Sequence, residues 1–222
     1  MRRVLPLLAR VLVGLNLAAC ARSARVGLGP LVRPAESLFD GKTLTGWVQR
    51  GGEAQYRVED GAIVGATRPN QPNSFLCTTR DYSDFILELE FKVDPDLNSG
   101  VQVRSQSLPE YHNGQVHGYQ IEIDPSPRAW TGGIYDEGRR GWLAPLDKNP
   151  GAQAAFKPGE WNSMRVEARA DLIRAWINGI PTAEIHDSMT PRGFIGLQVH
   201  GVGSEAAERT VRWRGLRLRK LD

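Results

Sequence analysis

Gln120, Glu122 and Asp124 are the residues of this sequence whose types and spacing point most directly to chemistry. They alternate with apolar residues, and alternate residues of a β-strand share one face at a spacing of about 6.5 to 7 Å. Carboxylates this close resist joint ionisation, so the pKa of one of them should rise. A carboxyl group with a raised pKa suits general acid or base catalysis. Ion pairs with Arg104 or Arg128, or plain exposure to water, would explain the same residues.

A long stretch from Asp124 to Pro158 follows this run, and it lacks strand periodicity. Loops of this length inside a compact domain are usually functional. Tyr135 and Trp142 could offer flat surfaces to a sugar ring. Glu137 and Arg140 could form hydrogen bonds with its hydroxyl groups. An ordered surface loop held by buried tryptophans would have the same composition.

The histidines offer two further possibilities. His200 is expected on the same strand face as Gln198, close to the predicted site. His112 and His117 could bind a divalent metal with one of the carboxylates of the first run, but their spacing matches no known zinc or calcium motif. A metal cofactor therefore stays an open alternative, and no metal ligands are assigned.

The elements that must position these residues are short strands separated by turns. Half-buried antiparallel strands show this alternation of apolar and polar residues. Asp60-Gly61 and Asn178-Gly179 are typical of tight hairpin turns, and Gly215 marks a shift of phase where a β-bulge is expected. Many such strands together predict an all-β, lectin-like antiparallel sandwich, or jelly roll. The clearest alternating segments are 85–93, 101–104, 119–124, 164–169 and 195–200.

The amino terminus resembles a bacterial lipoprotein leader. Basic residues precede an apolar stretch, and Leu17-Ala18-Ala19-Cys20 resembles a lipobox, in which Cys20 is lipidated after cleavage. We expect a signal peptide over 1–19, a tether over 20–35 and the jelly-roll domain over 36–222. The mature protein would then be anchored by lipid in the bacterial cell envelope, facing the periplasm or lying on the outer membrane. A plain secretory peptide with an incidental cysteine is the alternative.

The charge and the cysteine content argue against a nucleic-acid-binding protein and against an internal disulfide. The chain has 28 basic and 25 acidic residues, and loss of the leader with its three arginines would make these numbers equal. The basic character of the precursor therefore gives no reason to expect nucleic-acid binding. With Cys20 lipidated, Cys77 would have no disulfide partner, and its apolar surroundings predict a small buried residue.

An ordered series of short motifs resembles the 3-keto-disaccharide hydrolase domain family, from about Ser37 to Leu218. The resemblance implies a concanavalin A-like jelly roll with 3-keto-glucoside 1,2-lyase and 3-keto-2-hydroxyglucal hydratase activity. Many relatives carry Glu and then Gln where this chain has Gln120 and Glu122. The motifs are FDGKTLTGW (39–47), NSGVQVR (98–104), GYQIEID (118–124), GIYDE (133–137), WN (161–162), NG (178–179) and GFIGLQVH (193–200).

The implied reaction assigns roles to the candidate residues. A ketone at C3 makes the C2 proton acidic, so the site needs a base, a proton donor for the leaving oxygen and a group that stabilises the enolate oxygen. Glu122 or His200 would act as base and donor, with Arg104 and Gln198 near the oxygen. The sugar would be positioned by Gln120, Asp124, Tyr135, Glu137, Arg140 and Trp142. A sugar 3-oxidoreductase is the expected functional partner, because it would make the ketone.

Two other functions suit the same fold. A non-catalytic carbohydrate-binding module would bind a glycan without turnover, because a fold does not determine function. A retaining glucanase would need two carboxylates about 5 to 5.5 Å apart. Glu122 and Asp124 form an E-x-D pair, but the next residue on that face is Ser126 and a third acid is missing.

Overall fold

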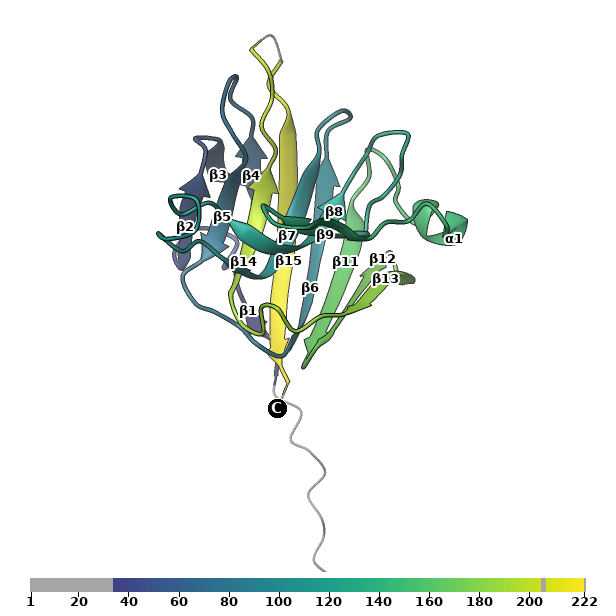
Figure 1. The fold of residues 1–222 in the computed structure, drawn as a ribbon. Helices are drawn as coiled ribbons and strands as arrows, with labels where there is room; N and C mark the ends of the chain where they lie inside the picture. The colour runs from purple at the N-terminus through teal and green to yellow at the C-terminus, as the bar shows by residue number, and fades with distance from the viewer. Residues whose placement is uncertain (1–33, 205–206, 222) are drawn as a thin grey trace, which may run out of the picture. The chain divides into compact units, whose positions relative to one another are not determined.

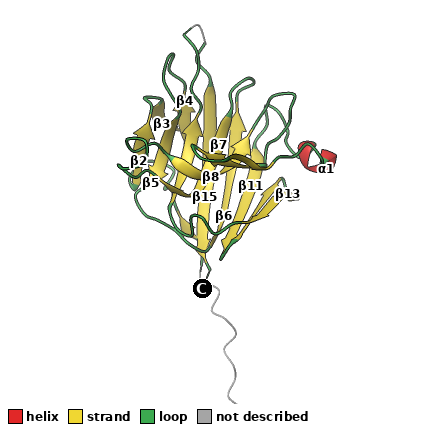
Figure 2. Ribbon diagram, viewed as in Figure 1, coloured by secondary structure: helices red, strands yellow, loops and turns green. Residues whose placement is uncertain are grey.

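Two antiparallel β-sheets packed face to face make up the domain in the computed structural model, which describes residues 34–204 and 207–221 (Figure 1 and Figure 2). This arrangement confirms the predicted antiparallel jelly roll. The expected leader, Cys20 and most of the tether lie outside the described residues. Within the described part of the chain, no helix has the length and apolar character needed to cross a membrane.

The first sheet has the order β13-β12-β11-β6-β15-β4-β3, and β1 also pairs with β15. Its strands are β1 (Glu36–Ser37), β3 (Gln55–Glu59), β4 (Ala62–Ala66), β6 (Phe85–Val93), β11 (Asn162–Arg169), β12 (Leu172–Ile177), β13 (Ile180–His186) and β15 (Thr210–Lys220).

The second sheet has the order β10-β9-β8-β7-β14-β5-β2. Its strands are β2 (Trp47–Gly51), β5 (Ser74–Thr78), β7 (Ser99–Gln106), β8 (His117–Ile123), β9 (Ile134–Glu137), β10 (Gly141–Ala144) and β14 (Phe194–Val199). A short helix, α1 (Pro150–Gln153), follows β10. The stretch from Asp124 to Pro158 is therefore not one long loop, because it contains two strands and this helix.

The core lies between the sheets and is built from the apolar residues of the alternating segments. Complete burial of such a side chain contributes roughly 1.5 to 3 kcal/mol. On β6 the opposite face is solvated, as Glu88 shows. On β8 and β14 the opposite face is buried as well, although Gln120, Glu122 and Gln198 lie on it. This buried polar face is the feature that the alternation alone did not reveal.

The strand pairing shifts register at several places, and two of these bulges bear on the site. The pairing of β15 with β6 shifts between Arg214 and Arg217, which confirms the bulge predicted at Gly215. The pairing of β7 with β8 shifts between Val103 and Gln106, and the backbone of Arg104 has a positive φ of 48°. Simple alternation misses this second bulge, which turns the Arg104 side chain out of its expected direction.

Arg104 is fully buried and ties β7 to two neighbouring segments. Its guanidinium donates hydrogen bonds to the carbonyl oxygens of Ser83 at 2.5 Å and Ala170 at 2.7 Å, and to the carboxylate of Asp84 at 2.9 Å. The prediction that Arg104 stabilises an enolate oxygen is therefore wrong, because the bulge directs its donors away from the remainder of the polar face. Arg104 has a structural role.

Replacement of this side chain tests that role. We expect Arg104→Met to lower the free energy of unfolding by about 3 kcal/mol, because the Asp84 carboxylate and two carbonyl oxygens lose their donor. Denaturant titration measures this loss, with Arg217→Met on the exposed face of β15 as a control expected to stay within about 0.5 kcal/mol of the parent. Equal stability of the two variants would contradict the structural role.

Candidate active site

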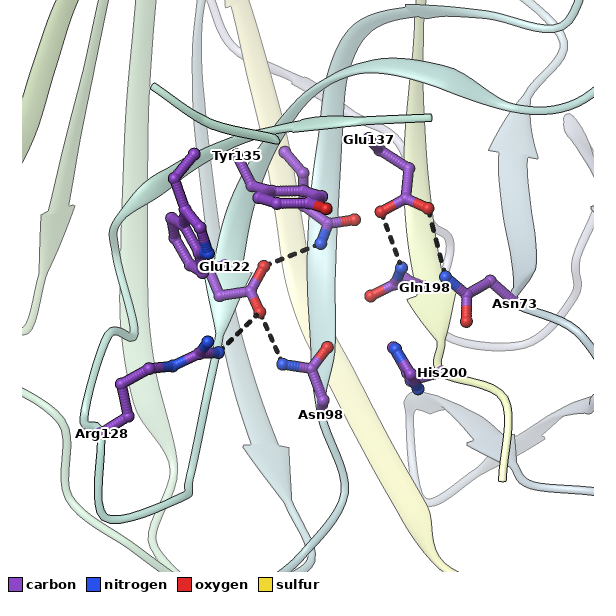
Figure 3. A pocket seen from close by; sticks show the side chains of 10 residues that line it. Asn73, Asn98, Glu122, Arg128, Tyr135, Glu137, Gln198 and His200 are labelled. Atoms are coloured by element: carbon purple, nitrogen blue, oxygen red, sulfur yellow. Dashed lines mark hydrogen bonds and ion pairs between the residues drawn. The ribbon is translucent and has the colours of Figure 1, made fainter. Parts of the chain in front are cut away.

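A pocket of about 230 Å³ lies on the polar face of the second sheet (Figure 3). This volume is several times the ~30 Å³ that one molecule of liquid water occupies, so the pocket has room for a small ligand. We call it the polar pocket. Its lining residues are Asn73, Asn98, Gln120, Glu122, Arg128, Tyr135, Glu137, Trp142, Gln198 and His200.

Strand register brings these residues together from distant parts of the sequence. Gln120 of β8 is opposite Tyr135 of β9, and Gly100 of β7 is opposite both Glu122 and Gln198. A Cβ atom on Gly100 would lie 2.4 Å from the side chain of Gln120. The glycine therefore allows Gln120 to lie across the neighbouring strand, where it reaches the carboxylate of Glu122.

A chain of hydrogen bonds orients that carboxylate. The Ser105 hydroxyl donates to Gln102 Oε1 at 2.6 Å, and Gln102 Nε2 donates to Gln120 Oε1 at 2.6 Å. Gln120 Nε2 then donates to Glu122 Oε2 at 2.9 Å. Each bond fixes the orientation of the next amide, so these three residues, Ser105, Gln102 and Gln120, form an amide relay that ends on Glu122.

Glu122 combines burial with hydrogen bonding. Its side chain is almost inaccessible, and Asn98 Nδ2 donates to Oε1 at 2.5 Å. Burial raises the pKa of the Glu122 carboxyl, and the hydrogen bonds from Asn98 and Gln120 offset part of that rise. A carboxylate that is held in place and poorly hydrated has the properties of a general base.

A second carboxyl group, Glu137 of β9, lies on the other side of the pocket (Figure 3). It accepts hydrogen bonds from Asn73 Nδ2 at 3.2 Å and from Gln198 Nε2 at 3.5 Å. The backbone N–H of Gly201 donates to Asn73 Oδ1 at 2.9 Å, which fixes the Asn73 amide. Burial raises the pKa of Glu137 as well, so the pocket contains two carboxyl groups that hold protons more tightly than usual.

Gln198 and His200 line the pocket on the same side as Glu137 (Figure 3). Gln198 is fully buried, and its Oε1 atom has no hydrogen-bond partner among the described residues. His200 is exposed, and its Nδ1 lies 2.8 Å from the carbonyl oxygen of Gly201. A carbonyl oxygen only accepts, so Nδ1 carries the proton of this hydrogen bond.

Aromatic rings and one arginine form the remaining wall. Trp142 packs edge-to-face against Trp130 at 4.7 Å and against Tyr135 at 5.1 Å between ring centroids. The Arg128 guanidinium lies over the Trp130 and Trp142 rings at 4.7 and 5.0 Å, and 4.0 Å from Glu122. The wall thus places a cation and a flat apolar surface beside the buried carboxylate.

Asp124 acts on this wall from outside the pocket. Its carboxylate accepts a hydrogen bond from Arg128 Nε at 2.8 Å and another from the backbone of Ser126. Burial opposes ionisation of Asp124, but the bonds from Ser126 and Arg128 prevail and lower its pKa. Asp124 is not one of the residues that line the pocket, so it positions Arg128 rather than a sugar.

Arg140 is also absent from the pocket, contrary to the prediction. Its guanidinium bridges Asp136 at 2.5 Å and Asp187 at 2.7 Å. Asp136 pairs with Tyr119, which points into the core, so it lies on the opposite face of β9 from Tyr135. An arginine that binds Asp136 is therefore drawn away from the pocket.

The structure brings together seven of the ten predicted site residues and separates Arg104, Asp124 and Arg140 from them. Prediction of the site missed Asn73, Asn98 and Arg128. Asn98 opens one of the family-like motifs and Arg128 lies four residues after Asp124, so the sequence offered a signal for these two. The seven that line the pocket are Gln120, Glu122, Tyr135, Glu137, Trp142, Gln198 and His200.

The histidine pair considered for a metal lies elsewhere. His112 and His117 pack against the ring of Tyr111, with centroids 4.6 and 3.9 Å away. Among residues 34–204 and 207–221, no group of three or more His, Cys, Asp or Glu side chains could hold a metal ion.

Solved structures with similar folds come from several carbohydrate-related proteins. A protein assigned as a glycosyl hydrolase from Parabacteroides distasonis ATCC 8503 is 22% identical with a TM-score of 0.59, and the match covers 85% of this chain and all (100%) of that one. Carbohydrate-binding module CBM66 from Bacillus subtilis is 16% identical with a TM-score of 0.59, over 81% of this chain and 98% of the module. At these identities the likeness concerns the fold.

A lichenase, a beta-1,3-1,4-glucanase derived from a mouse hindgut metagenome, is 11% identical with a TM-score of 0.56, over 84% of this chain and 97% of that one. Among curated proteins, none matches the chain. The 3-keto-alpha-glucoside-1,2-lyase-like domain matches residues 34–219, which is nearly the whole described domain and confirms the resemblance seen in the motifs. The chain belongs to the family of 3-keto-alpha-glucoside-1,2-lyase-like domains.

Proposed function

We propose that this protein cleaves 3-keto glycosides by elimination followed by hydration, which amounts to net hydrolysis. The observation that carries the proposal is Glu122, a buried carboxyl group with a raised pKa, oriented by the amide relay toward a pocket the size of a small ligand. Family membership supports the substrate class. The second carboxyl group, Glu137, supplies the opposite proton-transfer function that the reaction needs.

The elimination uses the two carboxyl groups in opposite protonation states. The C3 ketone acidifies the C2–H bond, and the Glu122 carboxylate takes that proton. The electron pair forms the C1=C2 double bond as the C1–O bond breaks. The protonated Glu137 gives its proton to the departing oxygen. Glu122 ends protonated and Glu137 ends ionised, and the sugar becomes 3-keto-2-hydroxyglucal.

Hydration reverses these proton transfers. The Glu137 carboxylate takes a proton from water, whose oxygen adds to C1, and Glu122 returns its proton to C2. The product is the free 3-keto sugar, and both carboxyl groups regain their starting states. His200 lines the same pocket as Glu137 and is exposed to solvent.

Arg128 takes the role first assigned to Arg104. Negative charge develops on the C3 oxygen during proton removal, two bonds from C2, the carbon whose proton Glu122 removes. The Arg128 guanidinium lies 4.0 Å from Glu122, so it can stabilise charge next to the base. Because the substrate carries a ketone at C3, an oxidation of the sugar must precede this reaction, and a sugar 3-oxidoreductase is the enzyme class that performs it.

A carbohydrate-binding module is the second candidate, because CBM66 has a similar fold. It would bind the same ligands without turnover. Incubation with a panel of 3-keto disaccharides separates the candidates: release of the 3-keto sugar supports the enzyme, whereas affinity without release supports the module.

The first prediction concerns the base. We expect Glu122→Gln to lower kcat for a 3-keto disaccharide by about 10² to 10⁴-fold, because the amide cannot remove the C2 proton. Glu88→Gln, an exposed carboxylate of the other sheet, serves as the matched control and should retain parental turnover. Full activity of Glu122→Gln would refute the assignment.

Solvent isotope incorporation tests the order of events. In D₂O, the 3-keto sugar released by the enzyme should carry deuterium at C2, because the proton that Glu122 removes exchanges with solvent after the leaving group departs, and Glu122 then delivers deuterium to C2. Rapid quenching and mass spectrometry measure the label, and the product incubated alone gives the background exchange. Direct hydrolysis, as in a retaining glucanase, would leave C2 unlabelled beyond this background.

The pH profile tests the environment of Glu122. The Asn98 hydrogen bond lowers the pKa of this carboxyl, so Asn98→Ala should raise that pKa. A base must be ionised, and the acidic limb of the kcat/KM profile should therefore move to higher pH in the variant. The Glu88→Gln profile is the reference, and an unchanged acidic limb in Asn98→Ala would show that Glu122 does not limit the reaction as a base.

A further inference from the structure

A second cavity of about 420 Å³ adjoins the polar pocket. Asn73 and Glu137 line both spaces, so these two residues lie at their boundary. The other lining residues of this second cavity are Gly51, Pro72, Phe75, Gln115 and Val116.

The second cavity has more apolar walls than the polar pocket because the sheet face changes character at β5. Phe75 pairs with Gln198 across the sheet, so the two side chains share a face. Phe75 and Val116 belong to a small apolar cluster with Cys77 and Phe194, apart from the main core. The same face therefore offers amides and carboxyl groups on β8 and β14, and apolar surface on β5.

A sugar would fit these walls poorly. Its hydroxyl groups need hydrogen-bond partners when they leave water, and Phe75, Val116 and Pro72 provide none through their side chains. The Asn73 amide is already bound to Glu137 and to the backbone of Gly201, which leaves the exposed Gln115 amide and the Glu137 carboxyl as the polar side chains of these walls. An aromatic ring would instead bury apolar area against Phe75, and apolar cavities of about 150 Å³ already hold a benzene molecule.

We propose that the second cavity is the leaving-group subsite and that it accepts an aromatic leaving group, a phenol, in preference to a second sugar. This inference rests on the proposed function, with the 3-keto sugar in the polar pocket. The glycosidic oxygen joins sugar and leaving group, and Glu137 lies where the two cavities meet. Its proton passes to that oxygen as the C1–O bond breaks, so the phenol leaves neutral.

The test compares two substrates, a phenyl 3-keto-glucoside and a 3-keto disaccharide of glucose. We expect the parent to have the higher kcat/KM for the phenyl substrate. Phenols also leave more readily than sugars, so the decisive quantity is how this ratio changes in variants. Val116→Thr, which puts a hydroxyl group in the second cavity, should lower the ratio at least about fivefold. Val116→Phe, which fills the cavity, should lower it further.

Two measurements exclude simpler explanations. Hydration of 3-keto-2-hydroxyglucal involves no leaving group, so retained hydration shows that each Val116 variant is folded. In these variants, the rate of phenyl-substrate cleavage should fall relative to the rate of hydration. Val48→Thr on the exposed surface of β2 is the matched control and should leave the substrate ratio unchanged. Equal loss on both substrates, or a parental ratio in both Val116 variants, would overturn the subsite.

Failure of the proposed function gives a different result. If neither substrate is cleaved, 3-keto-glycoside cleavage is refuted. Calorimetric binding of phenyl glucoside, which lacks the ketone, still tests the second cavity: weaker binding to Val116→Phe than to the parent supports an aromatic subsite, and equal binding overturns it.

Discussion

Removing an ionised carboxyl group from water costs several kcal/mol unless hydrogen-bond donors replace the solvent. At Glu122 the replacement comes from Asn98 and from the amide relay, which begins at Ser105. Ser105 lies next to Arg104 in the bulge of β7. One irregularity thus directs Arg104 toward Asp84 at one place and Ser105 toward Gln102 at another, so the chemistry of the pocket depends on a backbone feature outside it.

The far side of β9 is held by ion pairs in a comparable way. Asp136 binds Arg139 and Arg140, and Arg140 also reaches Asp187. Burial opposes ionisation of Asp187, yet its bonds from Arg140 and Tyr119 lower its pKa to about 2. These ion pairs hold β9 from the face opposite the pocket. They position Tyr135 and Glu137, although the residues that form the ion pairs do not line the pocket themselves.

Alternation in the sequence was enough to predict the jelly roll, because each strand with one apolar face must bury that face against a second sheet. It also placed Gln120 and Glu122 on the polar face of one strand and Gln198 on the polar face of another, without indicating that these faces are buried. The same argument failed for Arg104, since a bulge depends on how neighbouring strands pack rather than on the local pattern. Asn73 precedes β5, which three other strands separate from β9 in the sheet, and no local sequence pattern links Asn73 to Glu137. Arg140 was misplaced because it binds Asp136, whose side chain lies on the face of β9 opposite the pocket.

Gln198 Oε1 is a buried acceptor that no donor among the described residues satisfies. A hydroxyl group that points at this atom would gain a hydrogen bond without displacing a protein partner. An analogue in which that hydroxyl is replaced by hydrogen would leave the oxygen buried and unpaired, at a cost of about 1 to 3 kcal/mol. Deoxygenation at one carbon would then weaken affinity far more than at its neighbours, so this acceptor would act as a stereochemical filter on the sugars proposed as ligands.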